Sequence, residues 1–158
     1  MADSFHSPSV VLFLCTGNYY RSRFAELLFN HLADQLQLPW QGASRGLALE
    51  RGIHNVGPIA EATLQRLQSL NIRSSNPRFP LSVTVDCLQQ AKLVVALKEE
   101  EHRPLLQERF PGWEDRVTYW HVHDTDRAPP EEALPRITEL VTELVDSLQT
   151  RGNDPDNY

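Results

Sequence analysis

The chain has 158 residues, of which 41% are hydrophobic and 23% charged, and it carries a formal net charge of −6 at pH 7. The negative charge disfavours a nucleic-acid-binding protein, because such proteins bind through a basic surface and no run of Lys and Arg is present. The apolar stretch after the polar N-terminus is too short for a signal peptide or a membrane span, so we expect a cytoplasmic protein with no membrane contact.

A chain of this length can form one hydrophobic core, since it buries roughly two-thirds of its unfolded surface on folding. No internal repeat or low-complexity segment divides it. We therefore expect a single domain over residues 1–158, with flexible ends at 1–8 and 151–158.

The first predicted element is an apolar strand over residues 10–15. A short loop follows, and the spacing of apolar residues then predicts a helix that begins near Ser22 and stops before Pro39. A loop between a strand end and a helix start turns successive backbone N–H groups inward, where they can bind an anion. Gly17 and Asn18 are the loop residues that best tolerate the left-handed conformations such a turn needs.

Cys15 and Arg21 give this loop its candidate chemistry. A cysteine becomes a strong nucleophile when nearby positive charge or helix-end amides stabilise its thiolate. The planar guanidinium of Arg21 can hold two oxygens of a phosphoryl group in the ground state and in the transition state. Ser22 can either cap the helix or donate its hydroxyl to the Cys15 thiolate. The competing interpretation is that Cys15 is an inert core residue, because cysteine is among the most buried residue types.

Predicted strands and helices alternate along the rest of the chain. In order, they are a strand over 40–45, a helix opened by Gly57 and Pro58, a polar loop over 71–82, a strand over 93–97, a helix over 99–108, a strand over 117–122 and a helix over 130–149. Four strands alternating with helices predict a doubly wound parallel sheet, in which ligands bind beyond the carboxyl ends of the strands. Cys15 lies at that edge.

Metal and disulfide chemistry find little support in the sequence. Cys15 and Cys87 are the two cysteines and lie far apart, unlike the cysteines of a disulfide framework or a zinc site. His121 and His123 alternate along a predicted strand, but no third ligand follows at a familiar spacing. We therefore expect no metal and no other cofactor.

Four segments carry a family resemblance. VLFLCTGNYYRSRFAELLF, at residues 11–29, resembles the opening of the low-molecular-weight protein tyrosine phosphatases, which reads much like VLFVCLGNICRSPMAE. The further segments are ASRGL at 43–47, AKLVVALKEEEHRPLL at 91–106 and YWHVHD at 119–124. The resemblance thus covers nearly the whole chain.

The resemblance implies a three-layer α/β fold whose four-stranded parallel sheet has the strand order 2-1-3-4. It also implies a cysteine-dependent phosphatase that hydrolyses phosphomonoesters, protein phosphotyrosine among the candidates, through a phosphocysteine intermediate. In this interpretation Cys15 attacks phosphorus while Arg21 and the loop amides stabilise the equatorial oxygens. The implied substrate-binding residues are Thr16, Gly17, Asn18, Tyr19, Tyr20, Ser22 and Ser44.

A phosphatase of this kind also needs an acid that protonates the leaving oxygen. The spacing from Trp120 in the resembling family implies Asp124 for this role in preference to Asp126. The competing interpretation is that both are solvated loop carboxylates. The resemblance also implies that Ser44 hydrogen-bonds Asn18 and so holds the loop in shape, although an ordinary strand-end serine is an equal alternative.

Several residues depart from the family pattern. Tyr20 stands where many members have a second cysteine, and Arg23 stands where Pro is usual, which adds a cation near the anion site. The segment from Asp124 to Pro129 lacks the aromatic residues that wall the phenol slot of tyrosine-specific members, so Tyr19 is the candidate for stacking. The substrate could therefore be either a phosphorylated protein or a small phosphomonoester. We expect the protein to be a monomer or a weak dimer.

Two other functions remain as alternatives. Thiol-dependent arsenate reduction shares the fold and loop, but an intramolecular relay of three cysteines is impossible because Cys87 is the one other thiol. A non-catalytic phosphate- or phosphopeptide-binding module is the second alternative, suggested by the altered acid segment and by the adjacent Tyr19 and Tyr20.

Overall fold

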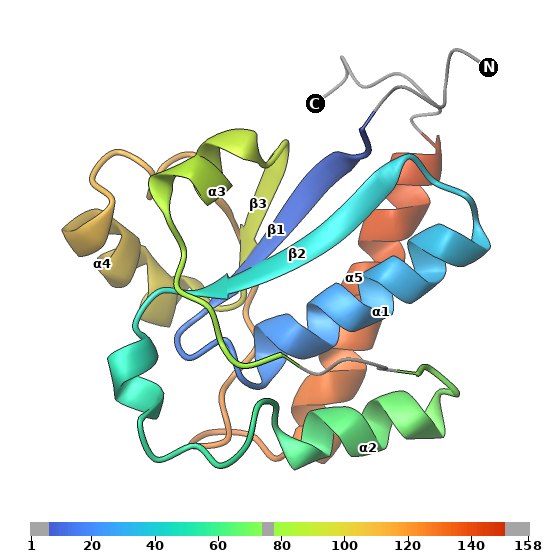
Figure 1. The fold of residues 1–158 in the computed structure, drawn as a ribbon, viewed down its shortest axis with the longest axis horizontal. Coiled ribbons are helices and arrows are strands. Elements are labelled where there is room, and N and C mark those ends of the chain that lie inside the picture. Colours follow the sequence, from blue (N-terminus) through green and yellow to red (C-terminus); the bar gives the residue numbers. More distant parts are fainter. Residues whose placement is uncertain (1–6, 74–77, 151–158) are drawn as a thin grey trace.

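The computed structural model describes residues 7–73 and 78–150, and these form a four-stranded parallel sheet between two layers of helices (Figure 1). The strands are β1 (Ser9–Cys15), β2 (Trp40–Gly46), β3 (Leu93–Ala96) and β4 (Thr118–Tyr119). Their order is β2-β1-β3-β4, which confirms the predicted doubly wound sheet and its strand order. The predicted flexible ends fall outside the described residues, apart from Ser7 and Pro8.

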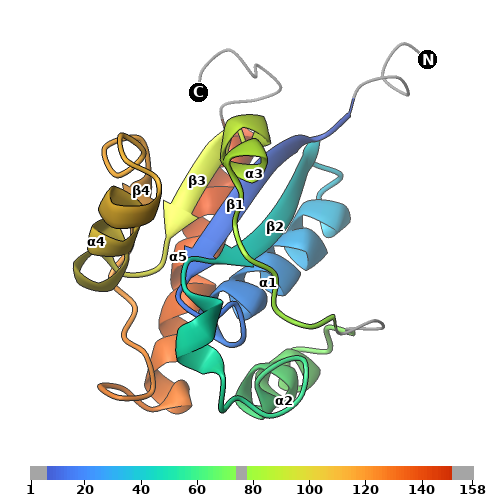
Figure 2. The ribbon, with the colours of Figure 1, turned by 60° about the vertical axis from the view of Figure 1, so that its left-hand side comes forward.

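Helices cover both faces of the sheet. They are α1 (Arg21–Gln35), the 3₁₀ helix η2 (Leu49–Gly52), α2 (Glu61–Ser69), α3 (Val85–Gln90), α4 (Glu99–Arg109) and α5 (Pro130–Thr150). Helices α1, α2 and α5 pack together on one face, and α3 and α4 cover the other (Figures 1 and 2). Within the described residues, no helix is both long enough and apolar enough to cross a membrane.

Strand β1 runs through the middle of the core. Val11 and Phe13 point into the apolar cluster formed with α1 and α5, whereas Leu12 and Leu14 point into the cluster beneath α3 and α4. All four side chains are at most 2% exposed. A strand that is buried on both faces reads as a continuous apolar run, which is why this element was evident in the sequence.

Three predicted elements differ from the observed ones. The fourth strand was predicted over 117–122 but is only two residues long. Beyond Tyr119 the chain still bonds to the end of β3 and the turn after it, since Trp120 N–H donates to Ala96 and Val122 N–H donates to Leu97. Helix α2 begins at Glu61 rather than at Gly57. Helix α1 ends well before Pro39, where Gln37 takes a left-handed conformation with φ of 53°.

Helix α3 was not predicted at all. It has only six residues, too few to show a helical periodicity, and it lies between the polar loop predicted over 71–82 and the strand predicted over 93–97. Thr84 begins it by accepting a hydrogen bond from the backbone N–H of Cys87 at 3.2 Å.

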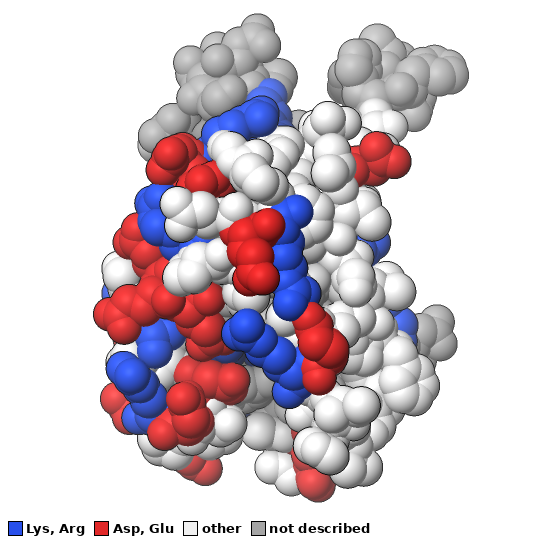
Figure 3. Space-filling model, turned by 90° about the vertical axis from the view of Figure 1, so that its left-hand side faces the viewer, with Lys and Arg blue, Asp and Glu red and all other residues white. Residues whose placement is uncertain are grey.

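The surface over α4 carries charges of both signs (Figure 3). Arg103 pairs with Glu99 and Asp115, and Arg109 pairs with Glu50. Basic and acidic side chains are thus interspersed on this face, and no single sign of charge dominates it.

Candidate active site

The loop between β1 and α1 has the backbone geometry of an anion-binding site. The carbonyl groups of Cys15, Thr16 and Tyr19 accept hydrogen bonds from backbone amides of other segments, and that of Tyr20 accepts from the Phe24 amide of α1 and the Thr63 hydroxyl. The backbone N–H groups from Gly17 to Tyr20, by contrast, donate to no acceptor within residues 7–73 and 78–150. A run of free amides in a loop at a helix start is the arrangement that binds anions.

Asn18 holds this loop in its conformation. It takes the predicted left-handed conformation with φ of 52°, whereas Gly17 does not, which corrects the expectation for that glycine. The fully buried Asn18 amide donates to Ser22 at 2.9 Å and to Ser44 at 3.0 Å, so the predicted bond to Ser44 is present. Its side-chain oxygen accepts from Arg78 Nη1 at 2.9 Å.

Sequence reasoning missed Arg78 and Glu26 in this network. Arg78 also donates to the backbone oxygen of Ser44, at 2.9 Å, and Ser44 in turn donates to Glu26. Arg78 follows a polar, proline-containing segment without periodicity, so no sequence pattern pointed to it. The network ties the anion loop to β2 and to the chain segment that precedes α3.

The Cys15 thiol lies at the base of the loop. Cys15 is 3% exposed, and its Sγ is 2.8 Å from the hydroxyl oxygen of Ser22. Because that hydroxyl oxygen already accepts from Asn18, its proton is free to be donated to Cys15. Ser22 does not cap α1, whose cap residue is Tyr20 with no side-chain bond, so of the two predicted roles the structure places Ser22 against the thiol.

The Arg21 guanidinium is 2% exposed and held on two sides. Nη1 donates to the backbone oxygen of Val122 at 3.0 Å, and Nη2 donates to Glu101 at 2.7 Å. Burial alone would lower the pKa of Arg21, but the nearby Cys15 sulfur and the Glu101 carboxylate outweigh it and raise the pKa above its ordinary value. The guanidinium therefore stays charged in a buried position.

The buried His102 forms a cluster with the half-buried Glu101 and Thr16 that the sequence did not reveal. One oxygen of Glu101 accepts from Arg21 and from the Thr16 hydroxyl, and His102 Nε2 is 3.1 Å from the same oxygen. Despite the effect of burial, hydrogen bonds from His102 and Arg21 hold the pKa of Glu101 well below its usual value. The run of three glutamates at the start of α4 reads as an exposed charged helix end, which concealed this role.

A cleft of about 190 Å³ opens above the loop. Its lining residues are Cys15, Gly17, Tyr19, Tyr20, Arg21, Asn55, Ala60, Ala62, Asp124 and Thr125. The cleft therefore brings the predicted nucleophile, arginine and acid together, although they are far apart in the sequence. Asp124 lies 3.5 Å from Arg21 Nη2 and lines the cleft, whereas Asp126 does not.

Two tyrosines form part of the cleft wall. The Tyr19 hydroxyl donates to the backbone oxygen of Val56 at 2.5 Å. Tyr20 is 7% exposed, and its buried hydroxyl has no hydrogen-bond partner in the part of the chain that the structure describes. Burial, and then the charge of Asp124, raise the pKa of Tyr20 to about 12.

Arg23 does not line the cleft, although its charge interacts with Cys15. Its guanidinium donates to the backbone oxygen of Pro58 at 3.0 Å and is 2% exposed. Burial, followed by the charge of Arg78, lowers the pKa of Arg23 to about 10. Arg23 therefore binds the chain segment before α2 rather than adding a donor to the cleft.

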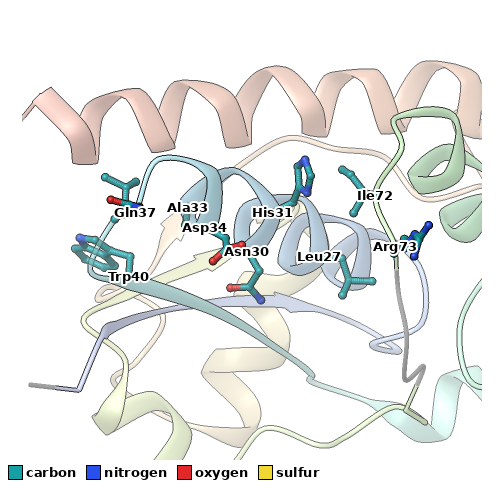
Figure 4. A pocket seen from close by; sticks show the side chains of 10 residues that line it. Leu27, Asn30, His31, Ala33, Asp34, Gln37, Trp40, Ile72 and Arg73 are labelled. Atoms are coloured by element: carbon teal, nitrogen blue, oxygen red, sulfur yellow. The ribbon is translucent and has the colours of Figure 1, made fainter. Parts of the chain in front are cut away.

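A second, larger hollow of about 720 Å³ lies between α1, the start of β2 and the chain after α2 (Figure 4). His31, Asp34, Trp40 and Arg73 are among its lining residues. Its lining includes none of the anion-loop residues and no cysteine or arginine other than Arg73, so we assign the chemistry to the smaller cleft. Within the described ranges, no group of three or more His, Cys, Asp or Glu is placed to hold a metal ion.

Comparison with known proteins decides the family. The model of the low molecular weight phosphotyrosine protein phosphatase family matches residues 10–151. The chain belongs to this family. It is therefore a hydrolase of the low-molecular-weight phosphatase type, which acts through cysteine chemistry.

Relatives within the family differ in what they act on. A protein-arginine-phosphatase from Bacillus subtilis (strain 168) is 30% identical over 107 residues, which is 68% of this chain and 67% of that protein. A low molecular weight protein tyrosine phosphatase from T. tengcongensis has a TM-score of 0.74 at 24% identity, covering 88% of this chain and 99% of that one. An arginine phosphatase from Geobacillus stearothermophilus has a TM-score of 0.71 at 25% identity, covering 91% and 95%.

Proposed function

We propose that the protein hydrolyses phosphomonoesters of phosphorylated proteins or small molecules through a phosphocysteine intermediate. The observation that carries this proposal is the convergence of Cys15, Arg21 and Asp124 on one cleft whose floor is a loop of free backbone amides. We place the reaction in the cytoplasm, where thiols stay reduced.

In the first step, Cys15 Sγ forms a bond to phosphorus while the bond from phosphorus to the leaving oxygen breaks. Arg21 and the loop amides bind the three equatorial oxygens, whose charge is stabilised in the transition state. Asp124 gives its proton to the leaving oxygen. In the second step Asp124 takes a proton from water, which attacks phosphorus and breaks the bond to sulfur.

The proposal is tested by hydrolysis of p-nitrophenyl phosphate by the wild-type protein and the Cys15→Ser variant. We expect the variant to lose turnover, because an alkoxide is far harder to form than a thiolate at neutral pH. Rapid acid quench of the wild-type reaction should trap phosphate on Cys15. Turnover that survives the substitution would exclude Cys15 as the nucleophile. A wild-type protein that binds phosphate but shows no turnover would support a binding module instead.

Phosphoarginine is a second candidate substrate. The curated relative acts on protein arginine phosphate, and the acid segment here presents Asp124 and Thr125 to the cleft rather than an aromatic wall. A carboxylate beside the leaving group suits a guanidinium. Comparing kcat/KM on matched phosphoarginine and phosphotyrosine peptides would decide between the two substrates.

Arsenate reduction has less support. Cys15 belongs to the apolar cluster on the α1 and α5 face of the sheet, whereas Cys87 packs on the α3 and α4 face. Both thiols are free. Transfer of oxidation from Cys15 to Cys87 would need the two to come together across the sheet.

A further inference from the structure

We propose that Glu101, supported by His102, is a positioning residue for Arg21 and the anion loop; this inference rests on the function proposed above. Glu101 lies on α4, contacts both Arg21 and Thr16, and has a side chain that is 25% exposed. It does not line the cleft. Its effect on the reaction would therefore pass through Arg21 and Thr16.

A single oxygen of Glu101 contacts every other member of the cluster. Oε2 accepts from Arg21 Nη2 at 2.7 Å, and also from the Thr16 hydroxyl. Thr16 directly follows the nucleophile in the chain, and Arg21 begins α1. The carboxylate thus joins the two ends of the anion loop, one through a hydroxyl and the other through a guanidinium.

His102 contacts the Glu101 carboxylate and holds it in place. The backbone N–H of Lys98 donates to His102 Nδ1 at 3.0 Å, so Nδ1 must be the unprotonated nitrogen. The proton is therefore assigned to Nε2, which lies 3.1 Å from Glu101 Oε2 and 3.1 Å from the Thr16 hydroxyl oxygen. Burial of the imidazole, which is 0% exposed, lowers the pKa of His102 and keeps it neutral.

These contacts determine how Arg21 presents its remaining donors. Nη2 is held by Glu101 and Nη1 by the carbonyl oxygen of Val122, so the plane of the guanidinium is set from two directions. Without Glu101, the nearest carboxylate to Nη2 would be that of Asp124, at 3.5 Å. Glu101 therefore both aims Arg21 and leaves Asp124 available as the acid.

The test compares Glu101→Gln and Glu101→Ala with Glu100→Gln and Glu100→Ala. Glu100 is an exposed residue on the same turn of α4, so its variants control for loss of a charge from the helix start. Each protein is assayed for kcat and KM with p-nitrophenyl phosphate, for binding of inorganic phosphate by calorimetry, and for its free energy of unfolding in urea.

We expect Glu101→Ala to lower kcat/KM by about 100-fold, since misplacing a catalytic group by about 1 Å has an effect of this size. Glu101→Gln keeps an oxygen that can accept from Arg21, so its loss should be smaller, about 10-fold, and its phosphate affinity should fall in step. The two Glu100 variants should match the wild-type protein in every measurement.

If Glu101→Gln matches Glu100→Gln in both kcat/KM and phosphate affinity, the positioning role of Glu101 is wrong. This comparison tests the role even when the Glu101→Ala variant does not fold. A lower unfolding free energy with unchanged phosphate affinity would likewise overturn it, because Glu101 would then serve stability alone. Phosphate binding is measured without turnover, so an inactive wild-type protein would refute the proposed function and still leave the positioning role testable.

Discussion

Asp124 and Asp126 are identical carboxylates two positions apart, yet only Asp124 lines the cleft, 3.5 Å from Arg21. We predict that Asp124→Asn lowers kcat for phenyl phosphate by about 10²- to 10⁴-fold, the usual contribution of a general acid. Asp126→Asn should change kcat by less than about threefold, because a solvated loop carboxylate contributes little. Steady-state kinetics on the two variants provides the measurement, and a larger effect from Asp126→Asn would reverse the assignment.

The buried hydroxyl of Tyr20 gives a prediction about stability. It has no hydrogen-bond partner among the described residues, so Tyr20→Phe should leave the free energy of unfolding unchanged or raise it by about 1 kcal/mol. Tyr119→Phe is the control, since the Tyr119 hydroxyl donates to the backbone oxygen of Glu114 at 2.8 Å. That variant should lose about 1 kcal/mol in urea denaturation. An equal loss in both variants would mean that the Tyr20 hydroxyl is paired in solution.

At the scale of elements, the end of β2 supports the anion loop through Gly46. A Cβ atom at Gly46 would lie 2.9 Å from the backbone oxygen of Thr16 and 3.1 Å from Asn18 Cβ. We predict that Gly46→Ala displaces the loop, weakens phosphate binding by at least about 10-fold and destabilises the protein by about 1–3 kcal/mol.

Gly42→Ala is a matched control for this prediction. It lies on the same strand, where the added atom would meet Phe29 at 3.1 Å rather than the loop. This variant should affect stability without affecting phosphate affinity. Calorimetric titration with phosphate separates the two effects, and equal affinities for both variants would show that Gly46 has no special role.

The elements that the sequence predicted best are those with the strongest local patterns. Strand β1 and helices α1 and α5 follow continuous or periodic apolar runs, and each was predicted within a few residues of its bounds, apart from the C-terminal end of α1. The charged helix α4 was predicted from its place after a buried strand, also within a residue of its bounds. Helix α3 and strand β4 are too short to have a period, and their formation depends on a cap at Thr84 and on hydrogen bonds to β3. The formation of such short elements depends on contacts with neighbouring segments of the chain.

For the whole molecule, the shifted pKa values of Glu101 and His102 make stability depend on pH. The pKa of Glu101 is held below its ordinary value of 4.5, so the unfolded chain binds a proton there first, and the stabilisation present above that pH is lost as the pH falls. The pKa of His102 is held below 6.5, so the unfolded chain is again protonated first and stability is again lost on acidification. Both groups therefore act in the same direction.

We predict that the free energy of unfolding decreases from pH 7 to pH 4, and that the decrease is smaller in Glu101→Gln below pH 5, because that variant has no carboxylate to protonate. Urea denaturation at several pH values provides the measurement. Stability that rises on acidification, or identical pH profiles for the two proteins, would contradict this account.

The doubly wound sheet, the anion loop between Cys15 and Arg21 and the family resemblance could all be predicted from the sequence, because each depends on residue types that are close together along the chain. The family resemblance also implied Asp124 as the acid, but its place in the cleft, and the contacts by which Glu101, His102 and Arg78 hold the loop, follow only from the folded structure. These residues lie up to 103 positions from Arg21 along the chain (124 − 21), and their charge or polarity is locally typical of an ordinary solvated surface. Only the packing of α4 and the segment before α3 against the carboxyl edge of the sheet brings those groups to Arg21 and Asn18.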